Sequence, residues 1–243
     1  MHNLICLLVL STLGIAPLTA SARQDVPRLP DGRPDLSGLW NGGGNIRNLA
    51  PGDEISMTPW AAEIFAYRSD PNGNAANEDP NLQCLPAGVP RMSPYPWRII
   101  QTPTHGPETH IFILYEGNIH SYRQIFMDGR PHPEDPDPTW YGHSIGWWEG
   151  DTLVVDTVGY NDRFWFSFEG HPHSEELHTV ERFARTAFDT LQWDITIEDP
   201  AAYTKPFTVL TRARLMPDDE LLEYICQENN TNMGRARGPA GNP

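Results

Sequence analysis

Histidine and glutamate side chains gather in one short segment in the second half of the chain. Residues 170–178 read Gly-His-Pro-His-Ser-Glu-Glu-Leu-His, which places three imidazoles and two carboxylates within nine residues. An imidazole beside a carboxylate titrates near neutral pH and can take or give a proton. The segment therefore indicates general acid–base chemistry. We expect His173 and Glu175 to form the working pair, with His143 from the run PTWYGHS as a partner across the opening of the fold.

A metal site is a competing interpretation of the same segment. Two histidines separated by one residue point to one face of a regular strand and can share a metal ion. However, Pro172 between them argues against a regular strand, and the spacing to a following glutamate is not that of cupin metal sites. No cysteine motif or further close histidine pair completes a tetrahedral set, so we expect no metal and no cofactor. In a third interpretation, His171 and His173 cap a loop or face solvent.

Two arginines have positions suited to holding an oxygen atom or a negative charge. Arg130 follows a turn, and its planar guanidinium can bind a carboxylate or an enolate oxygen, although a structural pair with Asp128 or Glu134 is the simpler alternative. Arg123 lies among apolar residues of an expected strand. If it points inward it must be paired, because an isolated buried charge is very costly. The candidate partners of Arg123 are Tyr115, Tyr122 and Asp156.

Aromatic side chains are concentrated in about one third of the chain. Some of them must serve core packing, but a pocket walled by such rings suits a flat apolar small molecule. Trp147 and Trp148 are adjacent, so at most one of them can line an interior, and Trp165 lies where a loop would cover an opening. The residues expected to bind the substrate are Tyr115, Arg123, Trp140, Tyr141, Trp148, Asp156 and Trp165.

The overall charge excludes two large classes of partner. The chain has 243 residues and a formal net charge of −15, which argues against binding nucleic acid or anionic lipid. Several familiar catalytic motifs are also missing: the G-x-S-x-G elbow, the phosphate-binding G-x-x-x-x-G-K-[ST] loop, G-x-G-x-x-G after a strand, and H-E-x-x-H. The expected partner is therefore an apolar small molecule.

The N-terminus has the composition of an export signal. An apolar run over 4–17 is followed by Ala20-Ser21-Ala22, which fits a cleavage site, and the run is shorter than the ~20 residues of a membrane-spanning helix. We therefore expect a signal peptide over 1–22, a secreted or periplasmic protein, and no membrane insertion after cleavage. In such an oxidising compartment Cys84 and Cys226 are expected to form a disulfide, with two buried thiols as the alternative.

The rest of the chain predicts an all-β fold with little helix. Short aromatic and β-branched runs separated by turns predict nine strands beyond position 97, the last over 221–228, in addition to a first strand that contains Trp40. They are mostly joined as hairpins, which favours an antiparallel sheet, and closure into a barrel removes exposed edges. One helix is expected over 58–68. The expected divisions are a wrapping segment over 23–96 with the first strand and the helix, a barrel over 97–230, and a flexible tail over 231–243.

Two resemblances accompany this pattern. Gly38-Leu39-Trp40 ahead of a series of strands is similar to the Gly-x-Trp signature of lipocalin-like barrels. Most of the chain also resembles a family of exported bacterial proteins that has no settled activity, so the resemblance implies export and leaves the reaction open. The runs that carry it are GRPDLSGLW (32–40), CLPAGVPRM (84–92), YRQIFMDGRPHP (122–133), PTWYGHSIGWWEGDTLVVDTVGYND (138–162), GHPHSEELHTVERF (170–183), DPAAYTKPFT (199–208) and LLEYICQEN (221–229).

Two functional hypotheses follow. In the first, a cofactor-free enzyme holds an apolar small molecule and acts as an isomerase, a lyase or cyclase, or a hydrolase. Its catalytic residues would be His143, His173, Glu175 and Arg130, with the arginine stabilising developing negative charge. In the second, the barrel binds or carries a small molecule without turnover. A structural envelope protein is a weaker third hypothesis, because it leaves the clustered histidines and tryptophans unexplained.

Overall fold

A computed structural model describes residues 25–42, 55–73, 75–91, 95–102, 107–117 and 121–228. The expected signal peptide and the expected C-terminal tail lie outside these ranges. Within them, no helix has both the length and the apolar character needed to cross a membrane.

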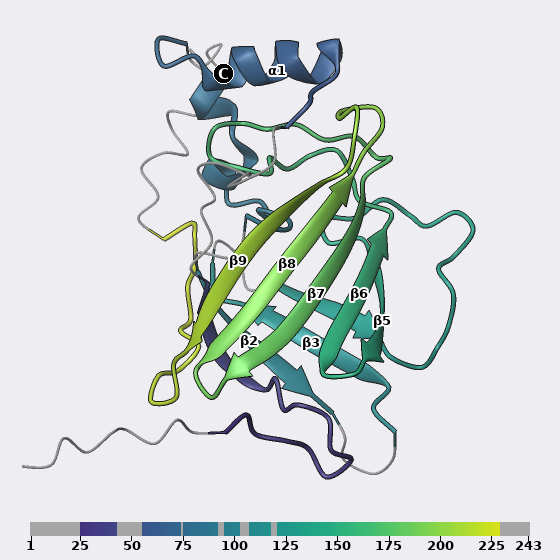
Figure 1. Ribbon diagram of the computed structural model, residues 1–243. Coiled ribbons are helices and arrows are strands. Elements are labelled where there is room, and N and C mark those ends of the chain that lie inside the picture. The colour runs from purple at the N-terminus through teal and green to yellow at the C-terminus, as the bar shows by residue number, and fades with distance from the viewer. Residues whose placement is uncertain are drawn as a thin grey trace, which may run out of the picture.

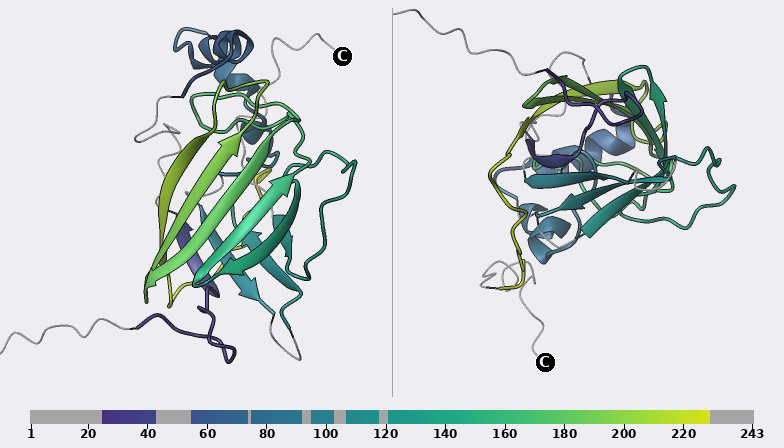
Figure 2. Two further views of the ribbon diagram at one scale, coloured as in Figure 1. Left: turned by 45° about the vertical axis from the view of Figure 1, so that its right-hand side comes forward. Right: turned by 90° about the horizontal axis from the view of Figure 1, so that it is seen from below.

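Nine strands close into one barrel, in which each strand lies beside its neighbours in the sequence and β9 pairs with β1. Viewed from below, the strands form a ring (Figure 2). The predicted all-β barrel is therefore confirmed, and residues 178–198 form one of the expected hairpins. The strands are β1 (Gly38–Gly42), β2 (Pro96–Gln101), β3 (His110–Tyr115), β4 (Ser121–Phe126), β5 (His143–Glu149), β6 (Thr152–Val158), β7 (His178–Ala187), β8 (Thr190–Glu198) and β9 (Phe207–Leu215).

One pair of neighbours departs from the antiparallel pattern. Strands β4 and β5 run parallel, and every other neighbouring pair in the barrel is antiparallel. In a closed ring of nine strands the direction cannot alternate all the way round, so at least one pair must be parallel. A parallel pair needs a long connection rather than a tight hairpin. The proline-rich segment 127–142 supplies that connection and projects from the side of the barrel (Figure 1).

The sequence was wrong about the last expected strand. Residues 221–228 form no strand, and Leu222 and Tyr224 are 62% and 47% exposed. The physical reason is that β9 already pairs with β1, so the barrel has no open edge to receive another strand. The segment is instead attached to the segment before β2 through a disulfide between Cys84 and Cys226, which confirms the expected pair.

Helix α1 (Pro59–Ser69) lies across one end of the barrel, and residues 25–37 lie near the other end (Figure 1). Thr58 caps the helix by accepting a hydrogen bond from the backbone N–H of Ala61, and proline occupies the first helical position as expected. Trp60 and Tyr67 of this helix are 45% and 57% exposed, and Ala61 is its buried residue. Two short 3-10 helices follow, η1 (Ala75–Glu78) and η2 (Pro80–Gln83).

The inside of the barrel is filled by aromatic rings. Trp97, Phe183 and Trp193 pack together, with 5.4–6.4 Å between ring centres. The space that they enclose with Ile113 and Tyr115 has no room for a water molecule. The centre of the barrel is therefore core, and a ligand must bind elsewhere.

Candidate functional site

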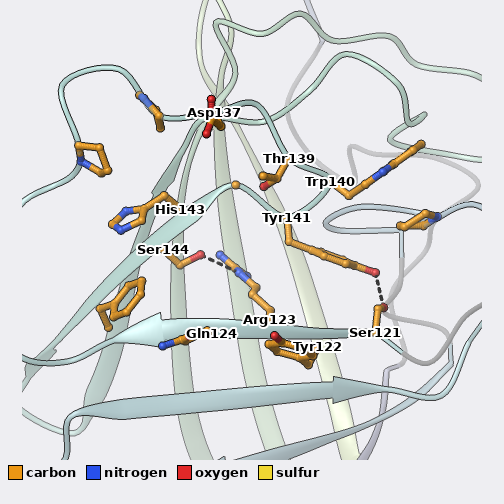
Figure 3. A pocket seen from close by; sticks show the side chains of 15 residues that line it. Ser121, Tyr122, Arg123, Gln124, Asp137, Thr139, Trp140, Tyr141, His143 and Ser144 are labelled. Atoms are coloured by element: carbon orange, nitrogen blue, oxygen red, sulfur yellow. Dashed lines mark hydrogen bonds between the residues drawn. The ribbon is translucent and has the colours of Figure 1, made fainter.

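A pocket of about 580 Å³ opens in the barrel wall where β4 and β5 meet. The two strands pair only at Ile125 with Ser144 and at Phe126 with Ile145, so the first part of β4 has no partner on that side. The segment 127–142 borders this gap (Figure 3). A volume of this size is typical of small-molecule sites.

The walls of the pocket are mostly apolar, with polar groups toward the barrel. Aromatic rings and prolines form the sides, and serine, arginine and histidine side chains lie among them (Figure 3). Flat rings stacked against such walls would be held by their faces. The lining residues are Pro86, Ser121, Tyr122, Arg123, Gln124, Phe126, Pro133, Pro136, Asp137, Thr139, Trp140, Tyr141, Gly142, His143 and Ser144.

The backbone at the start of β5 sets the position of His143. Gly142 has φ +65°, and a Cβ atom there would lie 2.6 Å from the carbonyl oxygen of Val158. Only glycine avoids this clash, and L side chains rarely adopt this backbone conformation. The preceding segment is held by a hydrogen bond from the backbone N–H of Thr139 to the carbonyl of Gly159. His143 therefore enters the pocket wall from a fixed backbone.

His143 is the first member of a hydrogen-bonded chain of titratable groups on the outer face of the sheet. Its Nδ1 lies 2.8 Å from Nδ1 of His132, whose Nε2 lies 2.8 Å from Oδ1 of Asp156. Oδ2 of Asp156 lies 2.9 Å from Nε2 of His178, and Nδ1 of His178 lies 3.6 Å from Glu198. The chain thus links the pocket to the half-exposed surface of β7 and β8.

The hydrogen bonds determine where the protons lie in the neutral state. An ionised Asp156 only accepts, so His132 donates through Nε2–H and keeps a lone pair on Nδ1. That lone pair accepts from Nδ1–H of His143, which leaves Nε2 of His143 unprotonated. Nε2 of His143 makes no hydrogen bond to any of the residues that the structure describes. A neutral His143 of this tautomer is a proton acceptor.

The electrostatic surroundings favour these charge states. Burial, His132 and Arg130 lower the pKa of His143, so it stays neutral at neutral pH. Burial works to raise the pKa of Asp156, but the hydrogen bonds from His178 and His132 outweigh it and hold the value below its usual range. The pKa of His178 is raised, chiefly by its hydrogen bond to Asp156. The hydrogen-bonded chain of side chains therefore combines a neutral imidazole, His143, at the pocket with an ionised carboxylate, Asp156, behind it.

Arg123 points into the barrel and is fully buried. Its Nη2 lies 2.5 Å from Oε2 of Glu181, and its Nε donates to Ser144 at 2.9 Å. Trp193 donates to the other carboxylate oxygen of Glu181 at 3.0 Å. The sequence was wrong about the partner of this arginine: Tyr115 and Tyr122 do not pair with it, and Asp156 faces the histidine chain instead.

Four of the expected site residues line the pocket, and Tyr115 and Asp156 lie behind them. Arg123, Trp140, Tyr141 and His143 are lining residues. Tyr115 stacks behind Tyr141 with 5.2 Å between the ring centres. Asp156 reaches the pocket through His132.

The remaining expected residues lie elsewhere. Arg130 pairs with Asp128, as the simpler alternative had it, and stands over the ring of Phe126 rather than in the pocket. Trp148 donates to Glu108 at 3.4 Å. Trp165 is buried under Arg68 of α1 at the capped end of the barrel.

His173 and Glu175 do not form the pair that the sequence suggested. The His173 ring is 3% exposed and packs against Phe164 and Phe166. Its Nδ1 bonds to the carbonyl of Ser174, whereas Glu175 is exposed. Neither residue lines the pocket that contains His143.

The expected site residues did not include His132, His178 or Glu181. His132 is hidden in a proline-rich loop that has no periodicity, so nothing in the sequence could place it beside His143. The positions of His178 and Glu181 had a usable signal. The turn at 150–151 fixes the register of β5 against β6, and strand alternation then separates outward from inward side chains. The register of β7 on β6 puts His178 on the outer face near Asp156, and Glu181 on the inner face.

Neither a metal site nor a similar protein assigns a function to this chain. Among the described residues, no group of three or more His, Cys, Asp or Glu side chains is arranged to hold a metal ion. No protein-family model, no curated protein and no solved structure matches the chain. The barrel is thus established by its strand order, while membership of the exported family and the lipocalin-like kinship stay predictions.

Proposed function

We propose that the protein is an enzyme that removes and returns a proton on a flat apolar small molecule bound in the wall pocket. The observation that carries the proposal is the hydrogen-bonded chain from Asp156 through His132 to His143, a residue that lines the pocket. Proton transfer of this kind is common to isomerisation, dehydration and cyclisation. We also propose that the protein is exported, which the disulfide is compatible with.

The proton balance of the step is simple. Nε2 of His143 takes the proton from the substrate, while its Nδ1 proton moves to Nδ1 of His132. The positive charge then rests on His132, beside the ionised Asp156, and His143 is neutral again with a proton on Nε2. When it returns that proton to another atom of the substrate, its Nδ1 takes back the proton from Nδ1 of His132, so that both histidines are neutral again. Asp156 acts here as a positioning residue, because it reaches the substrate only through His132.

The test measures hydrogen exchange at acidic C–H positions. The probe is 2-tetralone, a flat bicyclic ketone, and deuterium uptake from D2O is followed by 1H NMR. We expect the wild-type protein to accelerate exchange above the buffer rate and His143→Gln to lose this acceleration. Arg182→Gln changes an arginine in an exposed ion pair with Glu149 and serves as the control, with exchange unchanged.

The pH profile separates the base from a merely structural histidine. Because the pKa of His143 is lowered, the exchange rate should rise with pH through a midpoint below 6.5 and then level off. Asp156→Asn removes the carboxylate that stabilises the charged His132. We expect it to reduce the rate at least tenfold while 2-tetralone binding changes little.

A carrier without turnover is the second candidate, and the apolar walls of the pocket favour it equally. It predicts that 2-tetralone binds to the wild type and to His143→Gln alike, with exchange at the buffer rate in both. That result would reject the enzyme and keep the binding pocket.

A further inference from the structure

The interior ion pair of Arg123 and Glu181 does not use every donor of the arginine. Nη2 contacts Glu181 and donates to Thr157 at 2.6 Å, and Nε donates to Ser144. Nη1 is buried and has no hydrogen-bond partner among the described residues. A buried donor without a partner costs free energy, so its presence in a pocket wall requires an explanation.

Arg123 lies at the inner side of the pocket. Figure 3 shows its side chain between Ser144 and Tyr141, within the ring of lining residues. Only 1% of the side chain is exposed, so water solvates it poorly. Tyr141 is held beside it by a hydrogen bond between its hydroxyl and Ser121 at 2.7 Å. Nη1 itself has almost no accessible surface, so a ligand that binds it must displace the side chains that cover it, and it then meets a preformed N–H donor in a dry environment.

The charge of the site decides which kind of ligand atom can accept a hydrogen bond from this donor. Glu181, whose side chain is 0% exposed, already neutralises Arg123. A ligand carboxylate would therefore leave one unbalanced negative charge in the interior, in a protein whose net charge is already −15. A neutral oxygen acceptor satisfies the donor without adding charge.

We infer that the pocket recognises a neutral carbonyl oxygen on a flat apolar molecule, which accepts a hydrogen bond from Nη1 of Arg123. Ketones, aldehydes and quinone-like compounds belong to this class. The inference rests on the proposed function for the place of binding and deepens it by naming the substrate class. A carbonyl held by an arginine is also the group that makes a neighbouring C–H acidic enough for a histidine base.

The experiment compares three ligands of nearly equal shape by isothermal titration: 2-acetylnaphthalene, 2-ethylnaphthalene and 2-naphthoate. In the wild type we expect 2-acetylnaphthalene to bind about tenfold more tightly than 2-ethylnaphthalene, because hydrogen bonds to charged donors have this strength. In a variant without the Arg123 donor, 2-ethylnaphthalene should bind more tightly than 2-acetylnaphthalene, because the ethyl compound is the more hydrophobic. The naphthoate should bind more weakly than the ketone.

The variant that removes the donor must not leave a buried charge behind. Arg123→Met combined with Glu181→Gln keeps the interior neutral and retains an oxygen acceptor for Trp193. The matched control is Arg182→Met with Glu149→Gln, the same pair of changes at an exposed ion pair. A wild-type measurement covers the case in which the double variant fails to fold: the Nε–H and Nη–H resonances of Arg123 should shift with the ketone and not with 2-ethylnaphthalene.

The outcomes separate this inference from the proposed catalysis. Preferential ketone binding in both wild type and His143→Gln supports the inference even if no hydrogen exchange is found. Equal or weaker binding of the ketone relative to 2-ethylnaphthalene, tighter binding of the naphthoate, or no binding of any of the three overturns the inference. In that case, observed hydrogen exchange with 2-tetralone would still support His143 as the catalytic base.

Discussion

At the scale of single residues, the interior of the barrel contains one ion pair that the fold cannot easily lose. Arg123 and Glu181 come from β4 and β7, which are not neighbours in the sheet, and both are fully buried. Glu181 also accepts from Trp193, which ties the pair to the aromatic core. Breaking a buried pair by removing one partner is strongly destabilising, whereas replacing both partners together need not be.

We therefore expect Glu181→Ala to lower the free energy of unfolding by about 3–5 kcal/mol, because it leaves Arg123 charged and unpaired in the interior. Urea unfolding followed by tryptophan fluorescence measures the change. Arg182→Ala, one position further along β7, should leave the unfolding midpoint almost unchanged since its pair with Glu149 is exposed. A Glu181→Ala variant as stable as Arg182→Ala would contradict this account.

At the scale of elements, the loop 163–176 and α1 together form the cap of the barrel. The ring of His171 contacts Phe65 of the helix, and His173 packs within the loop against Phe164 and Phe166. Gly88 has φ +67° and lies directly against the ring of Phe164. A Cβ atom on residue 88 would lie 2.3 Å from that ring, so only glycine fits there. The cap is thus built around a neutral imidazole in an apolar setting.

This burial predicts a loss of stability in mild acid. Burial lowers the pKa of His173 to about 4, with Arg68 acting in the same direction and the Ser174 carbonyl and Asp199 opposing it. Between pH 6.5 and pH 4 the unfolded chain binds a proton at this residue that the folded chain does not. The free energy of unfolding should therefore decrease as the pH is lowered from 6.5 to 4, by up to about 3 kcal/mol.

The measurement is urea unfolding at pH 7 and pH 4.5 for the wild type and for His173→Phe, whose ring suits the aromatic surroundings. The variant should lose less stability between the two pH values. An identical loss in both proteins would show that His173 does not carry the effect.

At the scale of the whole molecule, the disulfide joins two parts of the chain that the barrel leaves outside its sheet. Cys84 and Cys226 are 142 residues apart in the sequence, so the crosslink closes most of the chain into one loop. A crosslink of this span restricts the unfolded ensemble, and its removal should lower the free energy of unfolding by about 2–5 kcal/mol.

Thiol titration of the denatured protein tests the pairing directly. The mature protein expected after removal of residues 1–22 retains Cys84 and Cys226, so we expect no reactive thiol before reduction and two after it. Reduction should also lower the urea midpoint. Two thiols in the unreduced mature protein would contradict the disulfide.

Local patterns were sufficient for most of the fold. Alternation over β4 places Arg123 and Ile125 inside and exposes Tyr122, as the two-residue period of a strand requires. The Thr-Pro start of α1 was likewise visible. The errors arose where an element depends on distant partners: 221–228 has a strand-like composition, but no barrel edge is available to it.

The site divides in the same way. The sequence by itself determined which residue types are present and which face of a strand each occupies, because strand alternation is a local property with a period of two residues. It therefore placed His143 and Arg123 in strands and marked an aromatic-rich region. Only the tertiary structure decided that His132, rather than His173, is the partner of His143, and that Glu181 is the partner of Arg123. Those pairs join segments whose proximity is set by barrel closure and by the path of a proline-rich loop, and neither leaves a periodic signal in the chain.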